Sequence, residues 1–281
     1  MKPEYLLQPG RLLRRFIGRS EGAITHLPWG HKIEVIPGES IGRVLCRSGI
    51  FDLALTEALF RLVRPGDAIF DCGANIGYMT SVMSYCCGST GLVAAFEPNP
   101  RVLKVLNSNA ERWSQERGAP QIRVMSYAVG NHIHDAQFHL SDWDSAVGRL
   151  ASSDEEGLTV KVTTLDQAVT VLARCPSLIK IDTEGHELEA LQGAASLLEG
   201  TELRHVVLED WEMGYSPAIS HLRKLGFSIF AIDRSWHGPE LAPDFQGRNL
   251  PSWEAPNFLA TRDEAQVRAL FHGRGWRCLG W

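Results

Sequence analysis

Short apolar runs alternate with longer amphipathic segments over most of the chain. The apolar runs have the length and composition of buried strands, and apolar positions in the longer segments recur every three or four residues. This alternation predicts an α/β fold in which helices cover both faces of a mostly parallel sheet. The predicted strands are 68–70, 92–96, 122–125, 178–181, 205–208, 228–232 and 258–261. The predicted helices are 76–86, 100–113, 188–198 and 216–226.

The first fifty residues do not follow this alternation. Two β-prone runs, 33–36 and 41–46, flank a Pro-Gly pair and predict a hairpin. The first twenty residues interleave four arginines with apolar residues, which predicts an amphipathic helix. We therefore expect residues 1–50 to form an N-terminal helix and β-hairpin extension, and residues 51–281 to form the main domain. The Pro-, Gly- and Trp-rich segment after about residue 233 is a candidate substrate lid.

A second interruption falls between residues 131 and 164. Two strand-like runs, 136–140 and 158–162, surround a polar loop rich in Ser, Asp and Glu. The motifs with chemical content lie elsewhere, at the carboxyl ends of predicted strands. Open α/β sheets bind their ligands at this edge.

Composition and charge narrow the functional class. Hydrophobic residues make up 44% of the 281 positions, and no apolar run approaches the roughly 18 residues of a membrane-spanning helix. The 28 basic residues against 33 acidic ones give a formal charge of −5, so a basic footprint for nucleic acid is absent. The six cysteines form no CxxC pair, which is typical of reduced thiols and favours a cytoplasmic protein. The arginine-rich N-terminal segment and the tryptophans are compatible with a homodimer.

The turn Asp71-Cys72-Gly73-Ala74-Asn75-Ile76-Gly77 joins the first predicted strand of the sheet to a helix. Glycine lets the backbone bend sharply and lets a ligand approach the main chain closely. A dinucleotide fingerprint would read GxGxxG and would seat a pyrophosphate, but this turn has only Gly73 and Gly77. Asp71 suits an ammonium group better than a phosphate. S-adenosylmethionine carries an ammonium and a sulfonium and no phosphate, so the turn fits that ligand better.

Glu97 closes the second strand of the alternation, in the sequence Phe96-Glu97-Pro98-Asn99-Pro100. A carboxylate at this position can accept hydrogen bonds from both hydroxyls of a ribose. The feature alone is shared with NAD enzymes. Combined with the Asp71 turn, it predicts S-adenosylmethionine as the co-substrate.

Four motifs, in this order and spacing, resemble those of the FkbM-type methyltransferase family. They are Asp71-x-Gly73-x-Asn75-x-Gly77, Phe96-Glu97-Pro98-Asn99, Ala128-Val129-Gly130, and Ile179-Lys180-Ile181-Asp182-Thr183-Glu184-Gly185-x-Glu187. The resemblance spans roughly residues 51–209. It implies a class I methyltransferase (Rossmann-like) fold, with a seven-stranded, mostly parallel sheet, one antiparallel strand and helices on both faces.

The resemblance also implies a set of cofactor-binding residues. Glu97 would bind the ribose, Asp71 and Asn75 the methionine end, and residues 126–128 would border the adenine. The complete predicted set is Asp71, Gly73, Asn75, Gly77, Tyr78, Glu97, Pro98, Ser126 and Ala128.

Methyl transfer to a hydroxyl also requires a group that removes its proton. Asp182, Glu184 and His186 follow the strand 178–181 and are the candidate catalytic residues. Histidine has an unperturbed pKa close to neutral pH, although position 186 lies outside the family motif. The same three side chains could ligate a divalent ion. Their spacing is not a known metal signature, so we favour a metal-free site.

Acidic residues also surround Trp211, just after the strand 205–208. Glu209, Asp210 and Glu212 could line a sugar-binding cleft in which Trp211 is a stacking platform, or they could belong to a solvated loop.

The leading hypothesis is an S-adenosylmethionine-dependent O-methyltransferase that acts on a hydroxyl of a sugar, glycolipid or secondary metabolite. Its partner would be a small-molecule or glycan acceptor. Alternatives are N-methylation of an amine or peptide nitrogen, a nicotinamide-dependent oxidoreductase and a non-catalytic S-adenosylmethionine sensor. The missing middle glycine and the presence of Asp71 argue against the oxidoreductase.

Overall fold

The computed structural model describes residues 24–141, 148–150, 157–243 and 255–280. The predicted N-terminal helix lies outside these residues, as does much of the predicted lid segment. None of the helices in the described part of the chain is long and apolar enough to cross a membrane.

The main sheet has eight strands within the described residues. From one edge to the other they are β13 (Gly238–Ala242), β12 (Ser228–Ser235), β14 (Asn257–Thr261), β11 (His205–Glu209), β10 (Leu178–Ile181), β3 (Ala68–Cys72), β4 (Leu92–Phe96) and β5 (Gln121–Met125). All seven predicted strands are confirmed. The five strands from β11 to β5 are parallel, whereas β14 is antiparallel to both β11 and β12.

The eighth strand corrects the expected count of seven. A short turn after β12 returns the chain antiparallel to it, and this return forms β13 at the edge of the sheet. Antiparallel neighbours need only such a short connection, so the extra strand adds no crossover. The strand order also reverses between β3 and β10. A reversal of this kind opens a crevice outside the carboxyl ends of the strands, which is where ligands bind in such sheets.

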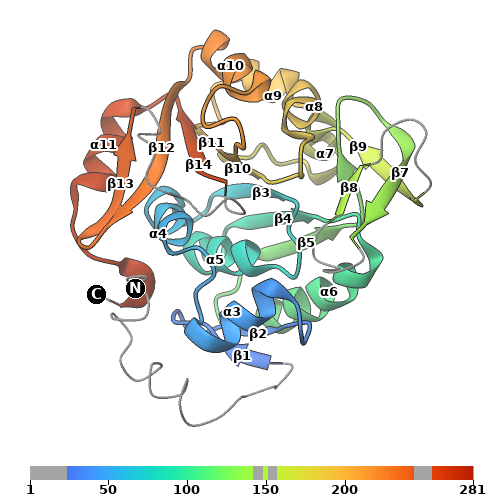
Figure 1. The fold of residues 1–281 in the computed structure, drawn as a ribbon, viewed down its shortest axis with the longest axis horizontal. Helices are drawn as coiled ribbons and strands as arrows, with labels where there is room; N and C mark the ends of the chain where they lie inside the picture. Colours follow the sequence, from blue (N-terminus) through green and yellow to red (C-terminus); the bar gives the residue numbers. More distant parts are fainter. Residues whose placement is uncertain (1–23, 142–147, 151–156, 244–254, 281) are drawn as a thin grey trace.

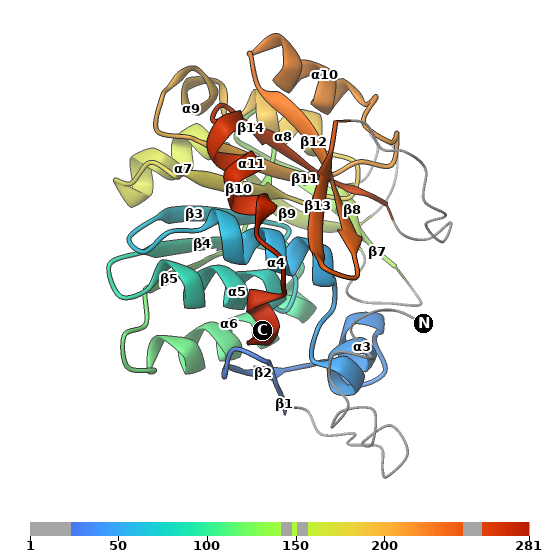
Figure 2. The same cartoon turned by 90° about the vertical axis from the view of Figure 1, so that its left-hand side faces the viewer.

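Two layers of helices cover the sheet, because neighbouring strand residues point to opposite faces. Ile69 belongs to the core under one layer, and Phe70 belongs to the core under the other. The first layer holds α3 (Ser40–Ser48), α4 (Leu53–Leu62), α5 (Tyr78–Cys87), α6 (Pro100–Ser114), α11 (Glu264–His272) and η1 (Arg277–Leu279). The second holds α7 (Leu165–Leu172), α8 (Glu187–Gln192), α9 (Ala195–Glu199) and α10 (Pro217–Lys224). Figure 2 shows α5 and α6 on one side of the strands and α7, α8 and α9 on the other.

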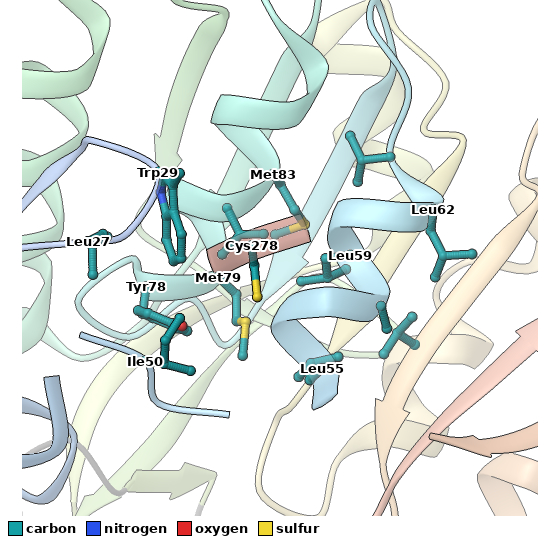
Figure 3. Close-up of a cluster of buried hydrophobic side chains, with 14 of the residues drawn as sticks. Leu27, Trp29, Ile50, Leu55, Leu59, Leu62, Tyr78, Met79, Met83 and Cys278 are labelled. Carbon is teal, nitrogen blue, oxygen red and sulfur yellow. The ribbon is translucent and has the colours of Figure 1, made fainter. Parts of the chain in front are cut away.

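The first layer is closed by the C-terminal segment. Figure 3 shows Cys278 among the apolar side chains of α4 and α5. Glu57 and Arg61 form a fully buried ion pair at 2.8 Å on α4. Arg61 donates hydrogen bonds to three carbonyls in residues 270–275, and Glu57 accepts one from the main-chain N–H of Cys278. The pair therefore ties the end of the described chain to α4.

The predicted hairpin is wrong in its position. The run 41–46 forms the helix α3, because Ile41 and Leu45 stand four residues apart and bury the same helical face. The hairpin is instead β1 (Ile24–His26) paired with β2 (Lys32–Glu34). It packs on α6, where the Trp113 indole N–H donates to the carbonyl of Lys32 at 2.9 Å.

The single helix predicted over 188–198 is two short helices, α8 and α9. Gly193 ends α8, and a Cβ atom at this position would stand 2.1 Å from the carbonyl oxygen of Gly130. This close approach of two main chains interrupts the helical path although the apolar spacing continues across it.

A smaller sheet occupies the region that interrupted the sequence pattern. Both predicted runs there are strands, β7 (His134–Leu140) and β9 (Leu158–Thr163), and they pair with β8 (Gly148–Leu150) and β6 (Ala128–Val129). β6 begins shortly after β5 ends, so this sheet stands at the carboxyl edge of the main sheet. Figure 1 shows it to the right of the main sheet.

Candidate active site

A pocket of about 640 Å³, including its open mouth, lies at the carboxyl ends of β3, β4 and β10 and against the smaller sheet. It is bounded by two groups of predicted residues. The turn wall is Gly73, Asn75 and Glu97, and the acidic wall is Asp182, Glu184 and His186. The other lining residues are Phe96, Pro98, Asn99, Tyr127, Ala128, Val129, Phe138, Gly148, Leu150 and Thr183.

The turn wall depends on a close contact between main chains. Gly73 has φ of +74°, and a Cβ atom on it would stand 1.8 Å from the carbonyl oxygen of Asp182. The N–H groups of Gly73 and Ala74 both donate to the carbonyl of Phe96 at 3.0 Å. Glycine at position 73 is therefore required by the space between β3 and β10, as well as by its backbone angle.

Glu97 joins the two loops of the turn wall. Its carboxylate accepts hydrogen bonds from the N–H of Asn75 and from the N–H of Asn99, both at 2.9 Å. Burial raises the pKa of Glu97 to about 7, although these two hydrogen bonds act in the opposite direction. A carboxylate oxygen has lone pairs for more than one hydrogen bond. Glu97 can therefore also accept hydrogen bonds from a ligand diol in the pocket.

Asp71 does not line the pocket. Its side chain is fully buried, accepts a hydrogen bond from the Thr80 hydroxyl at 2.6 Å, and lies 3.4 Å from the ammonium of Lys180. Lys180 also donates to the carbonyl of Gly73 at 2.9 Å and lies 3.2 Å from the Asp182 carboxylate. Burial opposes its charge, but the Asp182 and Asp71 carboxylates outweigh burial, and the pKa of Lys180 is raised. Asp71 therefore stabilises the turn indirectly, because it pairs with Lys180, which in turn donates to the carbonyl of Gly73.

Gly77, Tyr78 and Ser126 also lie outside the pocket lining. Tyr78 is buried in the core of the first helix layer, and its hydroxyl is 2.9 Å from that of Thr56 (Figure 3). Gly77 precedes α5 with φ of +93°, and Ser126 is exposed after β5. For these three residues and for Asp71, as for the predicted residues that line the pocket, contact with a cofactor stays a prediction.

The acidic wall is a short loop held by one carboxylate oxygen. Oε1 of Glu187 accepts hydrogen bonds from the N–H and the hydroxyl of Thr183 and from the N–H of Gly185, at 3.1–3.2 Å. Glu184, between them, has φ of +52° and a solvent-exposed side chain at the rim of the pocket. Although the residue as a whole is exposed, partial burial of its carboxyl group, and then the Asp182 and Glu187 carboxylates, raise its pKa to about 7.

His186 lies beside Glu184 and precedes α8. Its Nδ1 atom is buried and has no hydrogen-bond partner among the described residues. In the same part of the chain, no group of three or more His, Cys, Asp or Glu side chains has the arrangement of a metal site. The three predicted catalytic residues are thus brought together at the pocket, with Asp182 already paired to Lys180.

Sequence reasoning missed two parts of the site. Lys180, which connects Asp71, Asp182 and the turn, belongs to the fourth family motif, but the sequence indicated no role for it. Phe138 and Leu150 form an apolar wall from the smaller sheet. Apolar and polar residues alternate in the run 136–140, which is typical of a strand with one buried face, but only the placement of the smaller sheet brings Phe138 to the pocket.

Comparison with known proteins identifies the family. The family model described as Methyltransferase FkbM domain matches residues 71–229, which is more than half of the chain and includes every residue of both pocket walls. The chain belongs to the FkbM methyltransferase family. The resemblance seen in the motifs is therefore confirmed.

Two curated relatives have named activities. The chain is 32% identical to the hexuronic acid methyltransferase AglP of Haloferax volcanii over 156 residues, which are 53% of this chain and 61% of AglP. It is 28% identical to the 31-O-demethyl-FK506 methyltransferase FkbM of Streptomyces tacrolimicus over 201 residues, 60% of this chain and 75% of the relative. The match to AglP thus spans less than two thirds of that protein. A crystal structure of methyltransferase FkbM from Methylobacillus flagellatus is 16% identical, with a TM-score of 0.44, and the alignment covers 77% of this chain and 52% of that one.

Proposed function

We propose that this enzyme transfers a methyl group from S-adenosylmethionine to a hydroxyl group of a sugar or a secondary metabolite. The observation that carries the proposal is the pocket itself, in which a buried carboxylate suited to a diol faces an acidic wall across one continuous space. The names of the relatives support the acceptor class, since one is a hexuronic acid methyltransferase and the other acts on a demethylated FK506 oxygen.

In this proposal the turn wall holds the methyl donor. Glu97 accepts hydrogen bonds from the ribose hydroxyls, and the main chain at Gly73 and Asn75 faces the methionine end. Ala128 and Phe138 offer apolar contact to the adenine. When bound, S-adenosylmethionine supplies a methyl group activated by its sulfonium. The chain's contribution is to orient both reactants and to exclude water from the space between them.

In the same proposal the acidic wall removes the proton of the acceptor. Glu184 is the favoured base among Asp182, Glu184 and His186, because its pKa is raised to about 7 and it lines the pocket. Its carboxylate takes the hydroxyl proton while the acceptor oxygen bonds to the methyl carbon. Bound S-adenosylmethionine would supply the methyl group, and its sulfur would take the electron pair of the carbon–sulfur bond that breaks.

Calorimetric titration with S-adenosylhomocysteine and, separately, with NAD tests the donor. We expect binding of S-adenosylhomocysteine only. Glu97→Ala should weaken it by at least about 10-fold, since a hydrogen bond to a charged group contributes roughly 1.5–3 kcal/mol. Glu111→Ala, at an exposed glutamate of α6, is the matched control and should leave the affinity unchanged. Binding of NAD without S-adenosylhomocysteine, or an unaltered affinity in Glu97→Ala, would contradict the proposal.

A further inference from the structure

An exposed aromatic loop follows β11, directly beside the acidic wall. We define the aromatic loop as residues 210–215. The side chains of Trp211, Met213 and Tyr215 are 52%, 40% and 74% exposed. Single exposed apolar residues are common on protein surfaces, but this short loop exposes three large ones within five positions, which makes it a candidate binding surface.

The aromatic loop is held in one conformation by buried contacts. Asp210 is buried, and its two carboxylate oxygens accept hydrogen bonds from the N–H groups of Glu212 and Gly214 at 3.0 and 2.8 Å. The N–H of Asp210 donates to the carbonyl of Pro256 at 3.0 Å. The apolar side chains are therefore presented by a preordered main chain, which reduces the entropy that a ligand must overcome on binding.

Strand register places this loop next to the pocket. Ile181 pairs with Cys72 on one side and with Leu208 on the other, so the next residues, Asp182 and Glu209, stand side by side at the strand ends. The Glu209 side chain is partly buried, and no hydrogen bond or ion pair engages it among the described residues. Trp211 follows two positions later. The acidic wall thus continues through Glu209 to the aromatic loop.

The charge around this continuation is negative. Burial, reinforced by the Asp182 and Glu184 carboxylates, raises the pKa of Glu209, and Asp52 at the start of α4 acts in the same direction. The nearby cation is Lys180, which is buried and already contacts two carboxylates and a carbonyl. Arg223, an exposed residue of α10, donates to the carbonyl of Gly214. The surroundings of Glu209 therefore repel an anionic ligand and accept hydrogen bonds from hydroxyl groups.

We propose that the aromatic loop and Glu209 form the acceptor subsite, and that its occupant is an uncharged sugar ring rather than a hexuronic acid. The inference rests on the methyltransferase function proposed above and narrows its acceptor. A sugar ring has an apolar face of C–H groups, which packs on Trp211. Its rim of hydroxyls faces Glu209 and the acidic wall, where one hydroxyl is directed toward the methyl donor.

The test uses the full chain saturated with S-adenosylhomocysteine and two probes of the same shape, methyl β-D-glucopyranoside and methyl β-D-glucuronopyranoside. Ligand-observed NMR titrations at low and high salt give their dissociation constants. We expect the neutral glucoside to bind at least about 5-fold more tightly at low salt. The difference should shrink as salt screens the carboxylates.

Three variants connect the preference to the subsite. Trp211→Ala should weaken glucoside binding by about 5-fold to 10-fold, as expected for loss of an aromatic contact. Tyr85→Ala is the matched control, because Tyr85 is 50% exposed but belongs to α5, and it should change binding by less than twofold. At about pH 10, above the pKa of about 9 that burial and the neighbouring carboxylates give Glu209, Glu209→Gln should narrow the gap between the dissociation constants of the two probes, an effect that a merely structural role for Glu209 would not produce.

Tighter binding of the glucuronide, absence of glucoside binding, or equal effects of Trp211→Ala and Tyr85→Ala would each overturn the inference. Affinity for S-adenosylhomocysteine is measured on the same samples. If S-adenosylhomocysteine binds and the sugar preference is reversed, the acceptor subsite is wrong while the proposed function stands. If S-adenosylhomocysteine does not bind, the proposed function itself fails.

Discussion

The turn wall and the acidic wall face the same pocket but are built from different parts of the chain. In the turn wall, main-chain N–H groups and a glycine set the shape, and the single charged side chain is buried and hydrogen-bonded. In the acidic wall, the main chain is a loop with two residues at positive φ, and its side chains reach solvent. The turn wall is therefore a binding surface whose shape is set by the main chain, whereas the acidic wall presents side chains that can exchange protons.

This difference separates binding from chemistry. Substitutions at Gly73, or at Asp71 and Lys180 that support it, should change stability and donor affinity together. The same contacts hold the strands together and set the shape of the turn wall. Substitution of the exposed Glu184 in the acidic wall should change turnover and leave the free energy of unfolding almost unaltered. Lys180 connects the two, since it contacts Gly73 of one wall and Asp182 of the other.

The largest effect is expected from Gly73→Ala. The added Cβ would overlap the carbonyl oxygen of Asp182, which is main chain and has little freedom to move. We expect no detectable binding of S-adenosylhomocysteine by calorimetry and a loss of about 3 kcal/mol or more in the free energy of unfolding, measured with urea.

Gly30→Ala is the control for this change. Gly30 also has a positive φ, but a Cβ there would meet nothing within 4 Å. It should cost about 1–2 kcal/mol from backbone strain alone and should not alter donor affinity. If the two variants lost the same stability and Gly73→Ala kept its affinity for S-adenosylhomocysteine, the main chain at Gly73 would not set the shape of the turn wall.

A smaller but still large effect is expected from Lys180→Met. Removing the ammonium leaves the fully buried Asp71 carboxylate without its cationic partner, and breaking a buried pair in this way costs about 3 kcal/mol. Arg268→Met breaks the exposed pair with Glu264 on α11 and serves as the control, with no measurable change expected. Urea unfolding of both variants measures the effect. Equal stabilities would show that Asp71 and Lys180 do not support the turn.

The smallest effect on the fold, and the clearest on turnover, is expected from Glu184→Gln. If Glu184 is the base, its carboxylate form is needed, so the wild-type turnover should rise with pH through about 7. The variant should lose this rise and lower kcat about 100-fold, with stability and donor affinity unchanged. An unchanged pH profile would assign the proton transfer to Asp182 or His186.

Much of this architecture could be predicted from local patterns. The seven strands and the helix α6 could be predicted because buried strands and amphipathic helices each have a characteristic period of apolar positions. One error was a period assigned to the wrong element, because Ile41 and Leu45 are four residues apart and the run 41–46 forms a helix. The other arose where a tertiary contact overrode the period, because the main chain of Gly130 passes close to Gly193 and interrupts the predicted helix.

The sequence by itself determined the family, the α/β fold and the strand ends that carry the chemistry, because these depend on residue type and spacing. The tertiary structure decided which of those residues reach the pocket. Asp71 was predicted to bind an ammonium group of the cofactor, and in the structure its side chain is fully buried beside Lys180 and does not line the pocket. Strand register brought Glu209 beside Asp182, although 27 positions separate them (209 − 182). Packing of the whole chain decides where a side chain points and which residues lie next to it on adjacent strands. Neither can be predicted from the local sequence.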